Sequence, residues 1–387
     1  MGQATLASRP DPTNNPSNLN RPVDGAALCL SGGGYRAMLF HLGVLWRLAE
    51  TGWLFKLERI SSVSGGSVTS ALLALRWNEI KAANDKISAF KEQVVGPIMK
   101  LAAKTIDKPA ILQGLALPGS ISGRIAASYR KALYGSATLQ DLPDHPRFVI
   151  NATNIQSGVL WRFSKPYMAD YRVGVFEHPD VELAIAVAAS SAFPPVLAPL
   201  VLPLDASQLK PDPSADLQRE PFISKAVLAD GGVYDNLGLE TVWKNYRTVL
   251  ISDAGAKIMA EEAPKSDWAR LSYRVFEQVD NQVRSLRKRQ IMRGFFAEPG
   301  SDDYREGAYW SIRSDIGKFS ADSLPCPLEA TTRLAAVSTR LKALPNDLQC
   351  QLVNWGYAAC DAGLRTHVDA NLVKGRFPFP NEGVGQG

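Results

Sequence analysis

Three short glycine-rich segments carry groups that could form one site for acyl transfer. The segments are Ser-Gly-Gly-Gly-Tyr-Arg-Ala at 31–37, Ser-Val-Ser-Gly-Gly at 62–66 and Ala-Asp-Gly-Gly at 229–232. They offer the hydroxyl of Ser64, the carboxylate of Asp230 and the backbone N–H groups of Gly32, Gly33 and Gly34. Acyl transfer needs a nucleophile, a base and donors for the oxyanion that forms when a carbonyl is attacked. The three segments therefore predict an acyl-transfer site, provided that the fold brings them together.

Ser64 stands where an apolar strand is expected to end and a helix to begin. Residues 62–66 approximate the Gly-x-Ser-x-Gly turn that exposes a nucleophilic serine, with Ser62 in place of the first glycine. Gly65 and Gly66 permit a tight turn, and the positive end of the following helix would favour an alkoxide at Ser64. The same residues also suit a helix cap followed by an ordinary turn, so this alternative stays open.

Asp230 ends a second apolar strand and precedes two more turn-forming residues, Gly231 and Gly232. Open α/β sheets keep their sites at the carboxyl ends of strands, so we expect this carboxylate in the same site as Ser64. A free aspartate has a pKa near 4 and is a poor base for a hydroxyl, but burial would raise that pKa. The alternative is an Asx turn or a helix cap.

The glycine loop at 32–34 also fits a nucleotide site. Residues 32–37 match the Gly-x-Gly-x-x-Ala fingerprint of dinucleotide-binding proteins, between a strand and a helix. That fingerprint requires an acidic residue at the end of the next strand, where this sequence has Ser61 and Ser62. The Lys-Ser/Thr pair of a P-loop is missing as well. A dinucleotide-binding oxidoreductase stays as a distant alternative.

The periodicity of the chain predicts an α/β fold that positions these segments. Met38, Leu42, Leu45 and Ala49 recur at helical spacing after the first glycines, and a strand at 59–63 is followed by another helix. This order of strand, helix, strand and helix is typical of the start of a parallel sheet. We expect further strands at 148–154, 159–163, 226–229 and 248–252, and helices at 183–189, 266–293, 328–343 and 348–364.

We expect one catalytic domain over 21–375, with a flexible segment at 1–20 and a loose tail at 376–387. Residues 78–142 predict a helical insertion whose apolar stripe, with Phe90, Val94 and Ile98, would either cover the site as a lid or pack in the core.

Composition favours a globular cytoplasmic protein. The net charge is +5, and the four cysteines lack the spacing of a zinc site or a disulfide framework. The first 22 residues lack the apolar stretch of a signal peptide. Residues 183–203 carry no charge, but their prolines predict a buried helix followed by a loop, not a membrane span.

Four blocks in this order resemble the patatin-like phospholipase family. They are SGGGYRA at 31–37, SVSGG at 62–66, AVAASSAFPPVLAP at 186–199 and ADGGVYDNLG at 229–238. The resemblance implies a three-layer sandwich with a mostly parallel central sheet and a helical C-terminal region. It also implies hydrolysis of lipid acyl esters, of the phospholipase A or lysophospholipase type, without a metal or another cofactor.

The resemblance further implies a Ser–Asp dyad. Ser64 would be the nucleophile, Asp230 the base, and Gly32, Gly33 and Gly34 the oxyanion hole. Arg36 would contact a substrate phosphate, although a salt bridge or exposure to solvent suits a first-turn arginine equally. The enzyme would be peripheral to the membrane when active, with transient contact to its surface.

Two further sets of residues leave alternatives open. A catalytic triad would need one of the four histidines, and among His41, His145, His178 and His367 only His41 lies near a glycine-rich segment. Arg284, Arg287 and Lys288 form either a solvated helix face or a site for an anionic or nucleotide regulator. In the second case the protein would be an effector whose phospholipase is silent until a ligand binds. The oligomeric state is left open.

Overall fold

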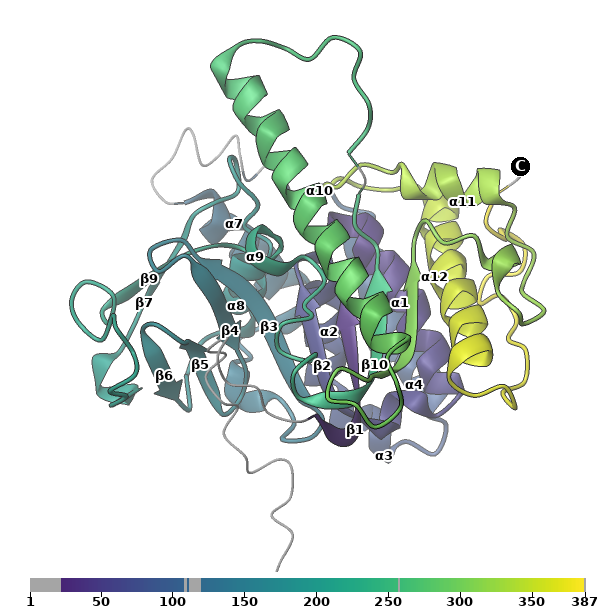
Figure 1. Ribbon diagram of the computed structural model, residues 1–387, viewed down its shortest axis with the longest axis horizontal. Coiled ribbons are helices and arrows are strands. Elements are labelled where there is room, and N and C mark those ends of the chain that lie inside the picture. The colour runs from purple at the N-terminus through teal and green to yellow at the C-terminus, as the bar shows by residue number, and fades with distance from the viewer. Residues whose placement is uncertain (1–21, 108–109, 111–119, 257, 386–387) are drawn as a thin grey trace, which may run out of the picture.

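The computed structural model describes residues 22–107, 110, 120–256 and 258–385, and a mixed sheet runs through them (Figure 1). The segment 1–20 expected to be flexible lies outside the described residues. At the centre of the sheet five strands run parallel in the order β11-β10-β1-β2-β3. They are β1 (Val23–Leu30), β2 (Leu57–Val63), β3 (Arg147–Asn154), β10 (Tyr246–Asp253) and β11 (Glu306–Ser311).

Beyond β3 the sheet becomes antiparallel. The strands there are β4 (Val159–Phe163), β5 (Tyr167–Asp170), β6 (Gly174–Glu177), β7 (Leu200–Pro203), β8 (Leu209–Lys210) and β9 (Lys225–Asp230). β4, β5, β6 and β8 continue the sheet in this order, whereas β9 pairs antiparallel with both β3 and β7. The expected α/β fold with a mostly parallel central sheet is confirmed, and the sequence did not predict this antiparallel extension.

Helices cover the sheet and create separate cores on its two faces. They are α1 (Gly34–Glu50), α2 (Gly65–Leu75), α3 (Trp77–Ala82), α4 (Lys86–Phe90), α5 (Gly96–Ala102), α7 (Ile121–Tyr129), α8 (Leu183–Ser190), α9 (Gly232–Asp235), α10 (Trp268–Phe295), α11 (Leu328–Ala335) and α12 (Asn346–His367). Alternate residues of β1 point to opposite faces: Leu28 packs in the core of α1, α2 and α12, and Cys29 in the core that includes Ile291 of α10. The result is a sandwich of three layers.

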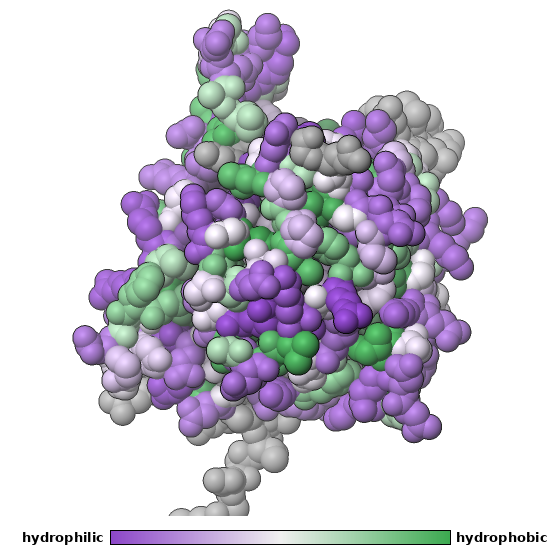
Figure 2. Space-filling model, turned by 90° about the vertical axis from the view of Figure 1, so that its right-hand side faces the viewer, coloured by the Kyte–Doolittle hydropathy of each residue, from purple (hydrophilic) through white to green (hydrophobic). Residues whose placement is uncertain are grey.

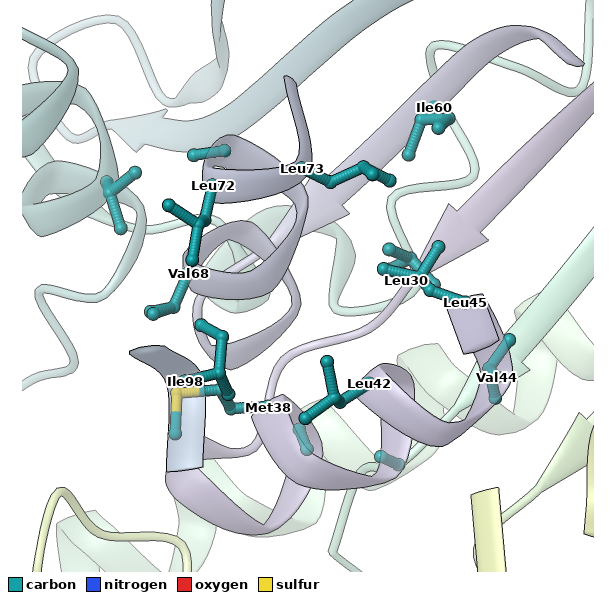
Figure 3. Packing of buried hydrophobic residues seen from close by; sticks show 14 of the residues in the cluster. Leu30, Met38, Leu42, Val44, Leu45, Ile60, Val68, Leu72, Leu73 and Ile98 are labelled. Atoms are coloured by element: carbon teal, nitrogen blue, oxygen red, sulfur yellow. The ribbon is translucent and has the colours of Figure 1, made fainter. Parts of the chain in front are cut away.

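The apolar stripe of the expected insertion belongs to the larger core. Phe90, Val94 and Ile98 are fully buried, and Figure 3 shows Ile98 against Met38 of α1. Of the two alternatives, the described residues of this stripe therefore fit core packing.

Two other expectations change. The segment 376–385 is not loose, because Asn354 of α12 donates from Nδ2 to the carbonyls of Phe379 and Gly383, both at 2.7 Å. The helix expected over 328–343 ends at Ala335, and the chain then turns to bring Arg340 against the N-terminus of α1.

No helix among the described residues combines the length and the apolar character needed to cross a membrane. The uncharged region at 183–203 forms α8, a loop and β7.

The contact between α1 and α12 generates a test of packing. A Cβ on Gly43 would overlap the carbonyl oxygen of Val353, so the two helices approach by their backbones. We expect Gly43→Ala to lower the free energy of unfolding by about 1–3 kcal/mol, the usual cost of overpacking. Urea unfolding would measure it. Gly96→Ala is the control, since a Cβ on Gly96 meets only the Lys91 carbonyl, at 3.7 Å. An equally mild effect of both substitutions would contradict the close approach.

Candidate active site

Ser64 occupies a sharp turn between β2 and α2. Its φ of 49° and ψ of −118° are unusual for a residue with a side chain, and such strain is often found at functional sites. The Ser64 N–H donates to Ser190 Oγ at 2.9 Å, which holds the turn from outside. Ser64 precedes the first residue of α2, so the positive end of that helix lies at its hydroxyl. The turn is thus of the type expected for an exposed nucleophile.

Strand β3 brings Asp230 beside this turn. β2 ends with Val63 opposite Asn151, and β9 ends with Asp230 opposite the next residue, Ala152. β4 occupies the other edge of β3, so β2 and β9 meet end to end along the same edge. The sequence placed Asp230 at the carboxyl end of a strand and gave no direction for that strand. β9 runs antiparallel to β3, and its end still lies beside the Ser64 turn.

Asp230 is buried, and its carboxylate has few groups to stabilise its charge. Burial raises its pKa to about 7, and the nearby Asp280 acts in the same direction. The Gly232 N–H, which donates to Oδ1 at 2.7 Å, and a hydrogen bond with the Ser64 side chain lower the pKa in part. A carboxylate with this pKa can take up a proton near neutral pH, which a free aspartate does poorly.

The glycine loop packs directly against the Ser64 turn. A Cβ on Gly65 would overlap the carbonyl oxygen of Gly34, so neither segment has room for a side chain at this contact. The Gly32 N–H donates to the backbone oxygen of Asn236 at 3.1 Å and is therefore not available to an oxyanion, contrary to expectation. No described residue accepts a hydrogen bond from the N–H of Gly33 or Gly34. These two groups remain as candidate donors.

The end of α8 and the residues that follow it hold both candidate residues in place. Ser190 Oγ accepts from the Ser64 N–H at 2.9 Å, and the Ala192 carbonyl accepts from the Asp230 N–H at 2.8 Å. The AVAASSAF block was noted in the sequence without a role for its members. Its structural role is to link the two strand ends.

Ser62, which departs from the Gly-x-Ser-x-Gly pattern, fits without crowding α2. Its Oγ lies 3.3 Å from the Val149 carbonyl and accepts from Ser67 Oγ at 3.1 Å. Ser67 Oγ in turn lies 3.0 Å from Ser190 Oγ. The hydroxyl of Ser62 thus joins the network that supports the turn.

A cavity of about 550 Å³ opens beside these residues. Its walls include the glycine loop, Ser64 and Asp230, the apolar segment 193–197, and one side of α10. The ring centroids of Phe193 and Phe276 lie 5.9 Å apart, and this contact joins the apolar segment to α10. The cavity therefore offers an apolar wall next to the two polar candidates.

Arg36 does not face this cavity, contrary to the expected contact with a substrate phosphate. The side chain is buried, and Nε and Nη2 donate to the Ala254 carbonyl at 3.2 and 3.0 Å. Nη1 donates to the carbonyl of Val337. The guanidinium thus ties the start of α1 to two other segments.

His41 is buried in a structural position. Its Nε2 lies 2.9 Å from the carbonyl oxygen of Ser31, which can only accept, so this nitrogen carries the proton. Its Nδ1 lies 2.9 Å from Ser252 Oγ. Burial lowers the pKa of His41 to about 4, so the ring is neutral at physiological pH. Both ring nitrogens are thus engaged away from Ser64.

The expected regulator cluster is neutralised by acidic partners. Arg284 and Lys288 both lie 3.1 Å from the buried carboxylate of Asp253, and Arg287 lies 2.8 Å from Glu240. Burial alone would raise the pKa of Asp253, but Arg284 and Lys288 hold it well below its usual range. These cations therefore anchor α10 to the end of β10 instead of forming a free anionic-ligand patch.

Sequence comparison identifies a family. A profile described as "Patatin-like phospholipase" matches residues 28–243, which is more than half of the chain. No curated protein sequence matches the chain significantly.

Comparison with solved structures gives matches at low sequence identity, and the human enzyme below shares the fold. Human GIVD cytosolic phospholipase A2 superposes with a TM-score of 0.51 and 13% identity, over 87% of this chain and 58% of that chain. The same enzyme with methyl gamma-linolenyl fluorophosphonate gives a TM-score of 0.51 and 15% identity, over 88% and 58%. VipD from Legionella pneumophila gives 0.33 and 15%, over 86% and 67%. The chain thus spans less than two thirds of the human enzyme.

The raised pKa of Asp230 has a consequence for stability. A carboxyl with a pKa of about 7 when folded and 3.8 as its ordinary value stabilises the fold below pH 4 and loses that contribution as pH rises to about 7. Asp230→Asn removes this dependence. We expect the variant to gain roughly 2–4 kcal/mol relative to the parent protein between pH 4 and 8.

Urea unfolding at pH 5 and pH 8 would measure this gain. Asp205→Asn is the control, because hydrogen bonds from the Ser207 side chain and backbone lower the pKa of the exposed Asp205, so this carboxyl is ionised in both the folded and the unfolded state above pH 5. The stability difference between that variant and the parent should therefore be the same at pH 5 and at pH 8. Parallel pH dependence of Asp230→Asn and the parent would contradict the raised pKa.

Proposed function

The chain belongs to the patatin-like phospholipase family, and from that premise we propose that it is a serine lipid acyl hydrolase with Ser64 as nucleophile and Asp230 as base. The observation that carries the proposal is the pairing of these two side chains. A serine on a strained turn and a buried carboxylate whose pKa is raised to about 7 lie together at the wall of one cavity.

The proposed reaction follows from this geometry. Ser64 Oγ attacks the ester carbonyl while its proton passes to the Asp230 carboxylate. The tetrahedral oxyanion accepts hydrogen bonds from the N–H groups of Gly33 and Gly34, which are strongest once the negative charge has formed. Collapse expels the alcohol, which takes the proton from Asp230. Water then hydrolyses the acyl-serine with the same two residues.

The cavity supports an acyl-ester lipid as substrate. Its apolar wall at 193–197 and Phe276 suits a hydrocarbon chain, and its polar residues gather at Ser64 and Asp230. We propose a phospholipase A or lysophospholipase activity on this basis. The buried position of Arg36 argues against its use as a headgroup ligand.

The alternatives have less support. In a dinucleotide-binding protein, the pyrophosphate would lie at the start of α1. Here the Arg340 carbonyl accepts a hydrogen bond from the Tyr35 N–H at 3.1 Å and lies close to Gly34, so that position is occupied. A nucleotide-activated effector loses its candidate site, because Arg284, Arg287 and Lys288 pair with buried or half-buried carboxylates.

Ser64→Ala tests the nucleophile. We expect the variant to fold normally and to lose hydrolysis of a fluorogenic phospholipid by about 10³-fold, because no hydroxyl remains to attack. The parent should form a covalent adduct with a fluorophosphonate, seen by intact mass, and the variant should not. Ser70→Ala, at a more deeply buried serine on α2, is the control. More than a tenth of the parent activity in Ser64→Ala would require another nucleophile.

The pH profile tests the base. Asp230 must be ionised to accept the proton, so kcat/KM should rise with pH around a midpoint near 7. This limb should persist in the triple variant His145→Gln, His178→Gln and His367→Gln, and Asp230→Asn should abolish activity. A midpoint near 4, the pKa of His41, or its loss in the triple variant would instead assign the base to a histidine.

A further inference from the structure

Helix α10 projects from the body of the molecule by its N-terminal half (Figure 1). Of its residues, only Arg284, Ile291 and Gly294 are buried, and all three belong to the C-terminal half. Figure 2 shows this end of the molecule standing above the surface, with hydrophobic residues among the hydrophilic ones. Among the described residues, the first four turns of this long helix therefore have no packing partner on their outer side.

The two sides of this helix differ. The inner side lines the cavity with Tyr273, Phe276, Asp280 and Arg284. The opposite side carries a row of apolar residues that are 44–83% exposed, which we name the outer stripe: Trp268, Leu271, Val275, Val279 and Leu286. Their spacing of three, four, four and seven residues places them along one side of an α-helix. A helix that is apolar on its solvent side is a feature of an interaction surface.

Charge indicates what kind of surface the outer stripe meets. The acidic residues of the helix, Glu277 and Asp280, lie on the cavity side. The charged residues in line with the outer stripe are Arg289 and Arg293, toward the C-terminal end of the helix, and of these Arg293 pairs with the exposed Asp303 at 3.1 Å. Apolar side chains followed by arginines, with no carboxylate between them, are typical of helices that lie on anionic lipid.

We propose that the outer stripe docks on an anionic phospholipid surface and thereby holds the cavity mouth at the lipid. This inference rests on the proposed function, since a lipid hydrolase must take its substrate from such a surface. A second copy of the chain fits less well, because Gln282 and Arg289 stand where a helix–helix seam needs apolar residues.

Vesicle binding tests the proposal. The full chain is sedimented with vesicles of phosphatidylcholine alone or with phosphatidylglycerol. We expect it to prefer the anionic vesicles. The triple variant Trp268→Ser, Leu271→Ser and Val275→Ser should bind them at least about tenfold more weakly, because the apolar area that enters the lipid is lost. The matched control is Leu328→Ser with Val373→Ser, which removes exposed apolar side chains elsewhere and should bind like the parent.

A second variant with a single substitution tests the outer stripe in case the triple variant does not fold. Val279→Glu puts a carboxylate into the outer stripe, and Val373→Glu is its control. Equal binding of the parent and both outer-stripe variants would overturn the proposal. So would light scattering that shows a parent dimer converted to a monomer by the triple variant, since a second copy would then cover the stripe.

Activity separates this proposal from the proposed function. Hydrolysis of a soluble short-chain ester should be equal in the parent and the triple variant, and hydrolysis of vesicle lipid should fall with binding in the variant. A parent that binds anionic vesicles through the outer stripe but hydrolyses neither substrate would overturn the proposed function and support the docking. If the parent and the triple variant hydrolysed both substrates equally, that result would support the proposed function and overturn the docking.

Discussion

One edge of β3 carries the ends of two strands that run toward each other, and the candidate site depends on this arrangement. Val63 and Asp230 pair with consecutive residues of β3, Asn151 and Ala152. Consecutive positions along a strand are about 3.3 Å apart. Main-chain register thus brings the ends of two strands that are distant in sequence together on β3, and no flexible side chain is needed to align them.

Backbone contacts without side chains extend this constraint around the site. Gly34 touches Gly65, and a Cβ on Gly231 would overlap the Asn151 carbonyl. The glycine loop, the Ser64 turn and the Asp230 strand end therefore pack as main chain on main chain. Rigid packing of this kind fixes the N–H groups of Gly33 and Gly34 in advance, which is what electrostatic stabilisation of an oxyanion requires.

The sequence predicted the parts of the fold that have strong local signals. The parallel strands followed by glycines and helices, the long helix α10 and the pairing of Ser64 with Asp230 in one cavity were all foreseeable from pattern. The short strands β5 to β8 carry few residues each, so their hydrophobic pattern is weak. The direction of β9 has no local signal, because strand pairing is decided by distant residues.

The roles of charged residues were the least predictable part of the site. Arg36, Arg284 and Lys288 looked like ligands for phosphate because the sequence does not show their partners. In the fold, Arg36 binds main-chain carbonyls, and the other two bind Asp253. The supporting role of Ser190 and the contact of Asn236 with Gly32 were missed for the same reason.

The return of the chain to β3 has a consequence for how this architecture can vary. After Asn154 the chain continues into β4 on one edge of β3, and from Lys225 it returns as β9 on the other edge. There β9 is held by main-chain pairing with β3 and by the hydrogen bond from the Asp230 N–H to the Ala192 carbonyl. Within this excursion β5 is tied to β3, because Asn154 donates from Nδ2 to Asp170 at 2.8 Å, but β6 and β8 pair with neither β3 nor β9. Evolution can therefore lengthen or shorten β6 and β8, and so reshape that flank of the protein, without shifting Asp230.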